Sequence, residues 1–294
     1  MLFFVALLVD GALAGAIYAL IALGFVVVYK ASRVINFALG EWLMLGALLV
    51  AAGVSRLALG LPVALLAACA GMIAFAALFN RLVLRRLVGR PVVSLIMVTL
   101  GLGALMRGGA AIAFRGVPGG VALPIPQHVV EVGGLFLSTD KLVAGAVAAL
   151  AVAAVTAIFR WSRTGVALRA VADDDRAAMA AGIDVQHHLV IAWAALGVVS
   201  VLAGTLWTSV ASGGVGLVLV GMKVFPVVVI GGLDSIHATI IAALLVGIVE
   251  SLVAGYVDPL IGTGFSSVAS FILVILVLFT RPYGLLGGAD IRRI

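Results

Sequence analysis

Five polar residues lie inside or beside long apolar stretches of the sequence: Tyr18, Asn36, Glu41, Lys223 and Glu250. An ionisable group without a partner is costly at membrane depth, so such residues line a transport path or join helices together. Both roles are open for Lys223. It could bind a substrate carboxylate, or it could pair with Glu41 or Glu250.

Glu41 has a similar choice of roles. It stands with Asn36 on either side of Gly40, where we expect a helix to break just inside the cytoplasmic face. Glu41 could accept hydrogen bonds from backbone N–H groups freed by that break, or it could pair with a cation and lock helices together. The candidate cations are Lys30, Arg33 and Lys223.

A second chemical feature is the polar segment 160–188, in which acidic and basic residues alternate. Ser162 to Gly165 can start a helix, Gly182 can end one in the left-handed conformation, and Asp184 can cap the next helix. We predict one or two short amphipathic helices. Either they form a solvated surface loop or they dock another protein, and the mixed charge favours docking because a lipid-facing helix would be mainly cationic.

Catalytic and metal-binding patterns are weak in this sequence. Asp173, Asp174 and Asp175 are the only acidic cluster and have no histidine nearby. The adjacent pair His187 and His188 would point about 100° apart on a helix, which does not suit one metal ion. We therefore predict no catalytic site, no metal site and no cofactor in this chain.

The composition indicates a membrane protein. Of the 294 residues, 65% are hydrophobic and 10% are charged, whereas a soluble domain has about 25% charged residues. The long continuous apolar runs are unlike the short alternating segments of an outer-membrane barrel. The net charge of +6 is read as cationic loops at a membrane rather than as binding to nucleic acid.

Nine segments are long and apolar enough to be membrane helices. They are 2–29, 37–54, 59–79, 92–114, 142–159, 189–211, 217–233, 238–256 and 267–280. Some are short or interrupted by glycine, so eight spans and one re-entrant piece fit equally well. The predicted fold class is an all-α polytopic membrane protein with about eight to nine transmembrane or re-entrant helices.

The cationic residues predict the orientation of these helices. If the nine segments alternate across the membrane, 13 of the 18 Lys and Arg residues fall on one side. Cytoplasmic loops carry the excess of cations, so we expect a periplasmic N-terminus and a cytoplasmic C-terminus. We predict that the first segment stays in the protein as a helix and is not a cleaved signal peptide. The longest periplasmic loop is predicted at 115–141, either as irregular structure or as a short hairpin.

Small residues predict where helices approach closely. Gly11 and Gly15 are spaced four residues apart, as on one face of a helix. A further group lies in the segment 92–114. Its members are Gly101, Gly103, Gly108 and Gly109.

Five motifs, in order along the chain, resemble one known family. They are GAIYALIALG at 15–24, VINFALGE at 34–41, the polar stretch 165–184, GMK with VIGG at 221–232, and RPYGLLG at 281–287. On these motifs the chain resembles the permease subunits of branched-chain amino acid ABC importers, the LivH type, over residues 7–287. This chain differs from the family pattern at Leu39, at 234–239 and at Arg176.

The resemblance implies partners and a place in the cell. The permease would pair with a LivM-like paralogue in the bacterial cytoplasmic (inner) membrane and contact membrane lipid. Two LivG/LivF-like ATPase subunits would hold ATP and Mg²⁺, and a periplasmic binding protein would deliver the substrate. The chain has no phosphate-binding GxxxxGK[ST] loop, so we expect a transport subunit and not an enzyme.

The resemblance also assigns the segment 160–188 as a cytoplasmic coupling helix within a single transmembrane domain, 1–294. The residues expected to meet the ATPase are Arg163, Gly165, Arg169, Asp173, Asp175, Arg176 and Gly182. The expected substrates are branched-chain or other apolar amino acids. Urea, short amides or small aromatic acids are the alternatives within the class. A proton-coupled secondary transporter that uses Glu41, Glu250 and Lys223 is the alternative outside it.

Overall fold

The computed structural model describes residues 1–87, 91–124, 128–132, 134–211, 213–262, 264–282 and 284–285. The side chains of Val92, Val132, Leu135, Asp175 and Arg176 lie outside this description. So do Arg90 and Ser212, and so does much of the C-terminal motif, including Tyr283, Leu286 and Gly287.

Nine apolar helices are present among the described residues, which confirms the predicted all-α polytopic fold. Seven are long enough to cross a membrane. These are α1 (Leu2–Ser32), α2 (Leu39–Arg56), α3 (Leu61–Phe79), α5 (Val92–Ala113), α6 (Thr139–Trp161), α9 (Val185–Val210) and α11 (Ile236–Tyr256). The two shorter helices are α10 (Gly216–Gly231) and α13 (Phe265–Thr280). The helix α3 continues through the π-helical turn η1 (Asn80–Leu84) and α4 (Arg85–Leu87).

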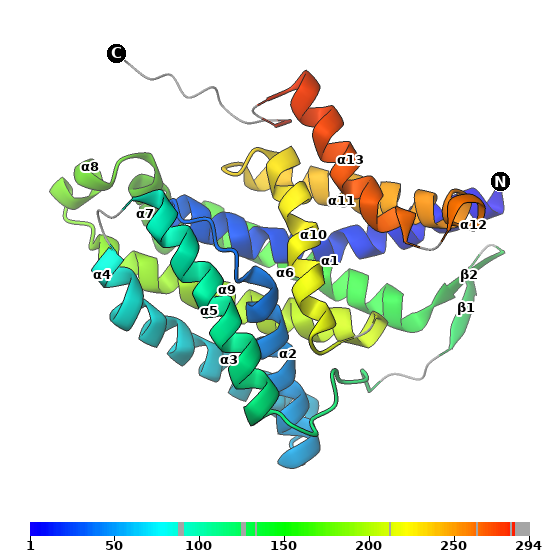
Figure 1. Cartoon of the computed structure of the whole chain (residues 1–294), viewed down its shortest axis with the longest axis horizontal. Helices are drawn as coiled ribbons and strands as arrows, with labels where there is room; N and C mark the ends of the chain where they lie inside the picture. Colours follow the sequence, from blue (N-terminus) through cyan, green and yellow to red (C-terminus); the bar gives the residue numbers. More distant parts are fainter. Residues whose placement is uncertain are drawn as a thin grey trace. The chain divides into compact units, whose positions relative to one another are not determined.

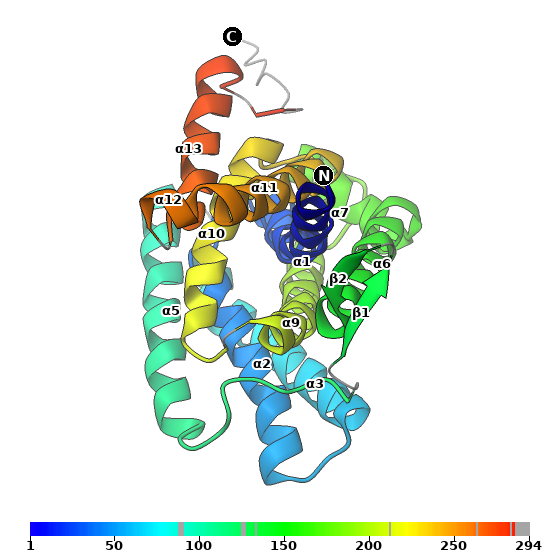
Figure 2. The same cartoon turned by 90° about the vertical axis from the view of Figure 1, so that its right-hand side faces the viewer.

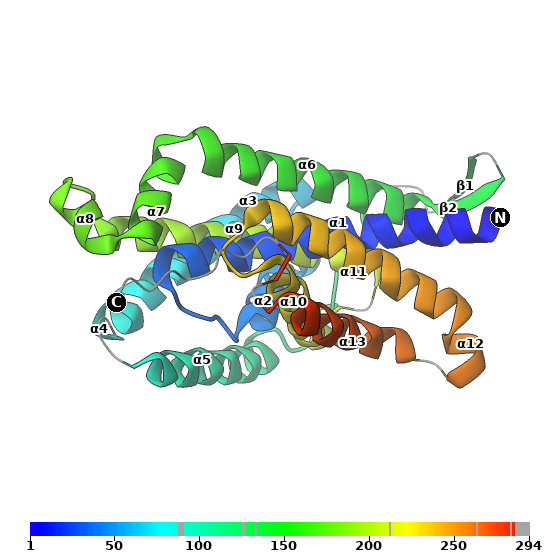
Figure 3. The same cartoon turned by 90° about the horizontal axis from the view of Figure 1, so that it is seen from above.

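Short polar elements connect these helices. Two of them, α7 (Arg163–Asp173) and α8 (Asp175–Ala180), form the segment between α6 and α9. The loop before α6 contains an antiparallel hairpin of β1 (Val129–Val132) and β2 (Leu135–Ser138). This hairpin lies beside the N-terminal end of α1 (Figure 3).

The chain divides into two compact units. The first comprises Met1–Val26, Ile125–Val152 and Lys223–Ile294. In this unit α1 and α11 cross closely, because Gly11 and Gly15 face Gly247 and leave no space for a Cβ atom. The close contact predicted for these two glycines is therefore present.

The C-terminal part of the first unit turns at α12 (Asp258–Ile261), which joins α11 to α13 (Figure 2). The Asp258 carboxylate accepts hydrogen bonds from the Ser266 N–H, the Ser266 hydroxyl and the Gly264 N–H. Burial alone would raise the pKa of this carboxyl, but these donors stabilise its charged form and hold the pKa below its ordinary value.

The second unit comprises Val27–Pro124 and Ala153–Met222. Its core is the contact of α2 with α3 and α9 (Figure 1). Trp42 packs against Phe75 and Trp193, with ring centroids 5.2 and 5.7 Å apart. Gly46 and Gly204 bring the α2 and α9 backbones together, since a Cβ atom on either would meet the backbone of the other helix.

The prediction that the glycines of α5 lie at close helix contacts holds for one of the four. Of the four, Gly103 has a close neighbour, the Glu41 side chain on α2. No described residue lies within 4 Å of a Cβ atom placed on Gly101, Gly108 or Gly109. Small residues permit a close approach but do not say which face of a helix is covered, and α5 packs through the face that contains Thr99, Gly103 and Met106.

Candidate translocation and coupling sites

The turn between α1 and α2 is built around a buried asparagine. The chain leaves α1 after Ser32, and Arg33 takes a left-handed conformation with φ of 53°. Asn36 is 1% exposed, and its Oδ1 accepts a hydrogen bond from the Ala38 N–H at 3.0 Å. The Asn36 Nδ2 has no hydrogen-bond partner in the part of the chain that the structure describes.

The predicted break at Gly40 is misplaced. The irregular turn is 33–38, and Gly40 lies inside the first turn of α2. Gly40 is there because α10 crosses it: a Cβ atom on Gly40 would lie 2.5 Å from the Val218 carbonyl oxygen, and Gly221 contacts the same point. Gly40 therefore allows α2 and α10 to cross closely and does not interrupt a helix.

Glu41 is buried in the second unit, where α2 meets α5. It is 4% exposed, and its Oε1 lies 3.4 Å from the Nε of Arg107, whose side chain is 48% exposed. The structure pairs Glu41 with Arg107, whereas the expected cations were Lys30, Arg33 and Lys223. Arg107 lies inside the apolar segment 92–114, and nothing in the local sequence connects it with Glu41.

The first unit contains a cluster of three predicted residues. The Tyr18 hydroxyl on α1 donates to Glu250 Oε2 on α11 at 2.6 Å, and the Lys223 ammonium on α10 lies 3.0 Å from Glu250 Oε1. Both carboxylate oxygens of Glu250 therefore have a donor. The structure thus shows the Lys223–Glu250 pair, one of the alternatives open for Lys223, and adds Tyr18 to it.

The segment 160–188 forms the two predicted helices. The Ser162 side chain caps α7 by accepting the Gly165 N–H at 2.9 Å. Gly165 packs against the Phe159 carbonyl, so no larger residue fits there. The Arg169 guanidinium donates to the Arg160 carbonyl at 3.0 Å and ties α7 to the end of α6.

Both ends of α8 are also closed by the expected residue types. Asp174 accepts the Ala177 N–H at the start of α8. At its end Gly182 has φ of 83°, and its N–H and that of Ile183 bond back to carbonyls of the last turn. Asp184 then caps α9 by accepting the His187 N–H at 3.0 Å.

One face of α7 is buried and the other is open. Leu168, Val171 and Ala172 are buried, whereas Arg163 and Asp173 are exposed. The Arg33 guanidinium donates to the Ala172 carbonyl at 3.0 Å, which joins the end of α7 to the turn after α1. The predicted contact residues Asp175 and Arg176 have backbones in α8, and their side chains lie outside the described part.

Comparisons with known proteins were made on the whole chain. Residues 7–280 match the family described as the permease component of the branched-chain amino acid transport system. The chain belongs to this family. This result confirms the resemblance found in the five sequence motifs, and it makes the chain a multi-span transport permease.

Two relatives match over nearly their whole length. The chain is 30% identical to the high-affinity branched-chain amino acid transport system permease protein LivH of Escherichia coli K12, over 100% of this chain and 98% of that one. It is 28% identical to the corresponding protein BraD of Pseudomonas aeruginosa, over 98% and 97% of the two chains.

A solved structure shares the fold. The complex titled PsaBC from Streptococcus pneumoniae with Fab aligns with a TM-score of 0.50 and 16% identity. The alignment covers 92% of this chain and 90% of that one. At this identity the match supports the helical membrane fold alone.

Over the described residues, no group of three or more His, Cys, Asp or Glu side chains is placed to hold a metal ion. Some charged side chains in this part of the chain join helices in ion pairs, as Asp10 on α1 does with Lys141 on α6.

Proposed function

We propose that this chain is a permease subunit of an ATP-binding-cassette importer for branched-chain or other apolar amino acids. The observation that carries the proposal is the family match over residues 7–280, with relatives of that substrate class at full length. The whole chain, 1–294, is proposed to act as one permease domain. The loop 115–141 is its periplasmic loop, and 160–188 is its cytoplasmic coupling segment.

The proposed assembly places the chemistry of ATP in other subunits. Two LivG/LivF-like ATPases hold ATP and Mg²⁺, a LivM-like permease completes the translocation path, and a periplasmic binding protein delivers the substrate. The chain would lie in the bacterial inner membrane with its N-terminus in the periplasm and its C-terminus in the cytoplasm, because its loop cations gather on one side.

The coupling role is proposed for the exposed side of α7 and α8. Arg163 and Asp173 are open to a partner, while the buried side of α7 and the Arg33 bond to Ala172 hold the helix against its unit. A displacement of α7 by a bound ATPase would be transmitted through the Arg33–Ala172 hydrogen bond to the turn after α1. The proposed contact residues are Arg163, Arg169, Asp173, Asp175, Arg176 and Gly182. Gly165, also expected there, is buried against the end of α6 and is proposed to position α7 instead.

Charge reversal tests this coupling role. The double variant Asp175→Lys, Arg176→Glu should insert into the membrane normally but lose transport-coupled ATP hydrolysis. Glu131→Lys, a reversal in the hairpin, is the matched control and should hydrolyse ATP like the parent. Normal coupled hydrolysis in the double variant would exclude docking through α8.

We propose that Tyr18, Lys223 and Glu250 form a helix lock and do not bind the substrate. This proposal is supported by the donors that both Glu250 oxygens already have. Asn36 and Glu41 are assigned to the same structural role in the second unit. A substrate-contact role would instead show as a change of KM for leucine uptake in variants that keep their stability.

Co-purification separates the importer from a proton-coupled carrier. The tagged chain should bring down ATPase subunits, and uptake should stop when ATP is depleted with the proton gradient intact. Uptake that persists without ATP, and without a bound ATPase, would overturn the proposal. Competition by urea, short amides and small aromatic acids against leucine, measured on the binding protein, distinguishes the alternative substrates.

A further inference from the structure

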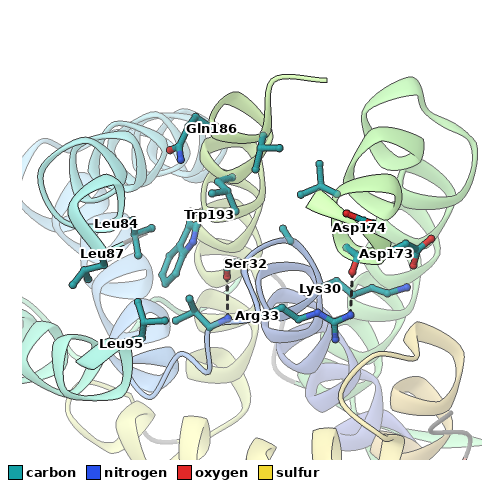
Figure 4. A pocket seen from close by; sticks show the side chains of 16 residues that line it. Lys30, Ser32, Arg33, Leu84, Leu87, Leu95, Asp173, Asp174, Gln186 and Trp193 are labelled. Atoms are coloured by element: carbon teal, nitrogen blue, oxygen red, sulfur yellow. Dashed lines mark hydrogen bonds between the residues drawn. The ribbon is translucent and has the colours of Figure 1, made fainter. Parts of the chain in front are cut away.

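A cavity of about 510 Å³ lies in the second unit, next to the coupling helix α7. The end of α1, the end of α7, the start of α9 and the η1–α4 turn contribute its walls. Its size is within the range of small-molecule sites. Figure 4 shows leucines at one side of the cavity and charged side chains at the opposite side.

The charged side holds one cation and one anion that have no ion-pair partner among the described residues. The Lys30 ammonium lies 5.9 Å from the centroid of the Phe159 ring, and within the described part of the chain it makes no hydrogen bond or ion pair. Asp173 is exposed and, over the described part of the chain, no ion pair joins it to Lys30 or to another cation. A ligand carrying both charges could satisfy both groups.

Two further polar atoms at the cavity lack partners. Trp193 is fully buried, yet its Nε1 donates to nothing in the described residues. The Gln186 Oε1 is likewise buried without a donor. Both residues line the cavity. Buried polar atoms without a partner are rare in folded proteins, and each points to a ligand or water that binds it.

The other side of the cavity is apolar. Leu84, Leu87 and Leu95 line it, from η1, α4 and α5, together with the Trp193 ring (Figure 4). This surface suits a branched aliphatic side chain. The arrangement therefore matches a small molecule with an ammonium and a carboxylate at one end and a hydrocarbon group at the other.

We infer that this cavity binds the zwitterion of an apolar α-amino acid at the cytoplasmic face of the permease. Lys30 binds the carboxylate, Asp173 binds the ammonium group, and the leucines contact the side chain. The occupant joins the end of α1 to the end of α7, so it holds the coupling helix in place and slows import when the product accumulates. The inference rests on the proposed function for its substrate class and orientation.

Binding is measured on the assembled importer in nanodiscs without the binding protein. The probes are L-leucine, leucinamide, which lacks the carboxylate, and 4-methylpentanoate, which lacks the ammonium group. The parent should prefer leucine over either analogue by about tenfold or more, as expected when one charged contact is lost. Lys30→Gln should lose only the preference over leucinamide, and Asp173→Asn only the preference over 4-methylpentanoate.

Glu131→Gln is the control and should keep both preferences. Binding of all three probes with equal affinity, or unchanged preferences in both variants, would overturn the inference. Each protein is also assayed for coupled ATP hydrolysis with and without excess leucine. The rate of coupled ATP hydrolysis with excess leucine, divided by the rate without it, should fall below one in the parent and stay near one in Lys30→Gln. An equal fall in both proteins would exclude the proposal that leucine bound in this cavity slows import.

The two proposals fail in different ways. If the importer takes up leucine but the variants change neither binding nor the hydrolysis ratio, the cavity inference fails and the proposed function stands. If the importer takes up no apolar amino acid, the proposed function fails, whatever the probes show at the cavity.

Discussion

Each unit of the chain contains a glutamate paired with a cation, but the two glutamates differ in how many donors they have. Glu250 receives a donor on each oxygen, from Tyr18 and from Lys223, and the Lys223 side chain is 27% exposed. Glu41 has one charged partner, Arg107, at 3.4 Å, and the Arg107 side chain is 48% exposed.

The difference is that both oxygens of Glu250 are held by donors, whereas Glu41 is paired with a cation that is half exposed. The Glu250 carboxylate, with two short contacts, holds three helices together, and removal of Lys223 leaves its charge uncompensated. The Arg107 side chain is half exposed, so water screens its contact with Glu41 and this pair is expected to add less stability. We therefore expect the first unit to lose more stability than the second when its pair is broken.

The largest effect is expected for Lys223→Met. The variant leaves the Glu250 charge with Tyr18 alone, and breaking such a buried pair lowers the free energy of unfolding by about 3 kcal/mol. The double variant Lys223→Met, Glu250→Leu should recover most of this loss because it removes both charges. Unfolding of the chain in bicelles measures both. A double variant less stable than the single one would contradict the lock.

Tyr18→Phe should have the next largest effect. It removes one hydrogen bond to a carboxylate while the ring is kept, and such bonds contribute about 2 kcal/mol. The same unfolding assay applies. Tyr256→Phe on α11 is the control and should cost less, because the Tyr256 side chain is exposed. Equal losses in the two variants would show that the Glu250 contact adds no stability.

Arg107→Met tests the more open pair and should cost about 1 kcal/mol, since half-exposed ion pairs contribute little. A loss as large as that of Lys223→Met would remove the contrast between the units. The comparison is sharpened by measuring leucine uptake in both variants under conditions in which each remains folded.

The smallest effects distinguish two glycines on α5. Ala at Gly103 would place its Cβ atom 3.0 Å from the Glu41 carboxyl carbon, whereas Ala at Gly108 meets nothing within 4 Å. Gly108→Ala should be neutral or raise stability by up to about 1 kcal/mol through helix propensity. Gly103→Ala should be about 1 kcal/mol less stable than Gly108→Ala. Equal stabilities of the two chains would contradict the contact.

Local signals predicted the coupling segment well. Ser162, Gly182 and Asp184 have the residue types that open and close helices, and each takes that role in the structure. Such caps depend only on neighbouring residues, so the sequence is sufficient. The turn at 33–38 was missed because Gly40 suggested a break, whereas its lack of a side chain serves the crossing with α10.

The sequence by itself indicated a polytopic membrane protein with nine apolar segments, because the length and apolarity of each segment are local properties. The five motifs indicated the permease family. The tertiary structure alone decided the partners of the buried charges and which glycines lie at crossings. Tyr18 and Glu250 are 232 residues apart, and such contacts depend on which helices pack together, which no local pattern encodes.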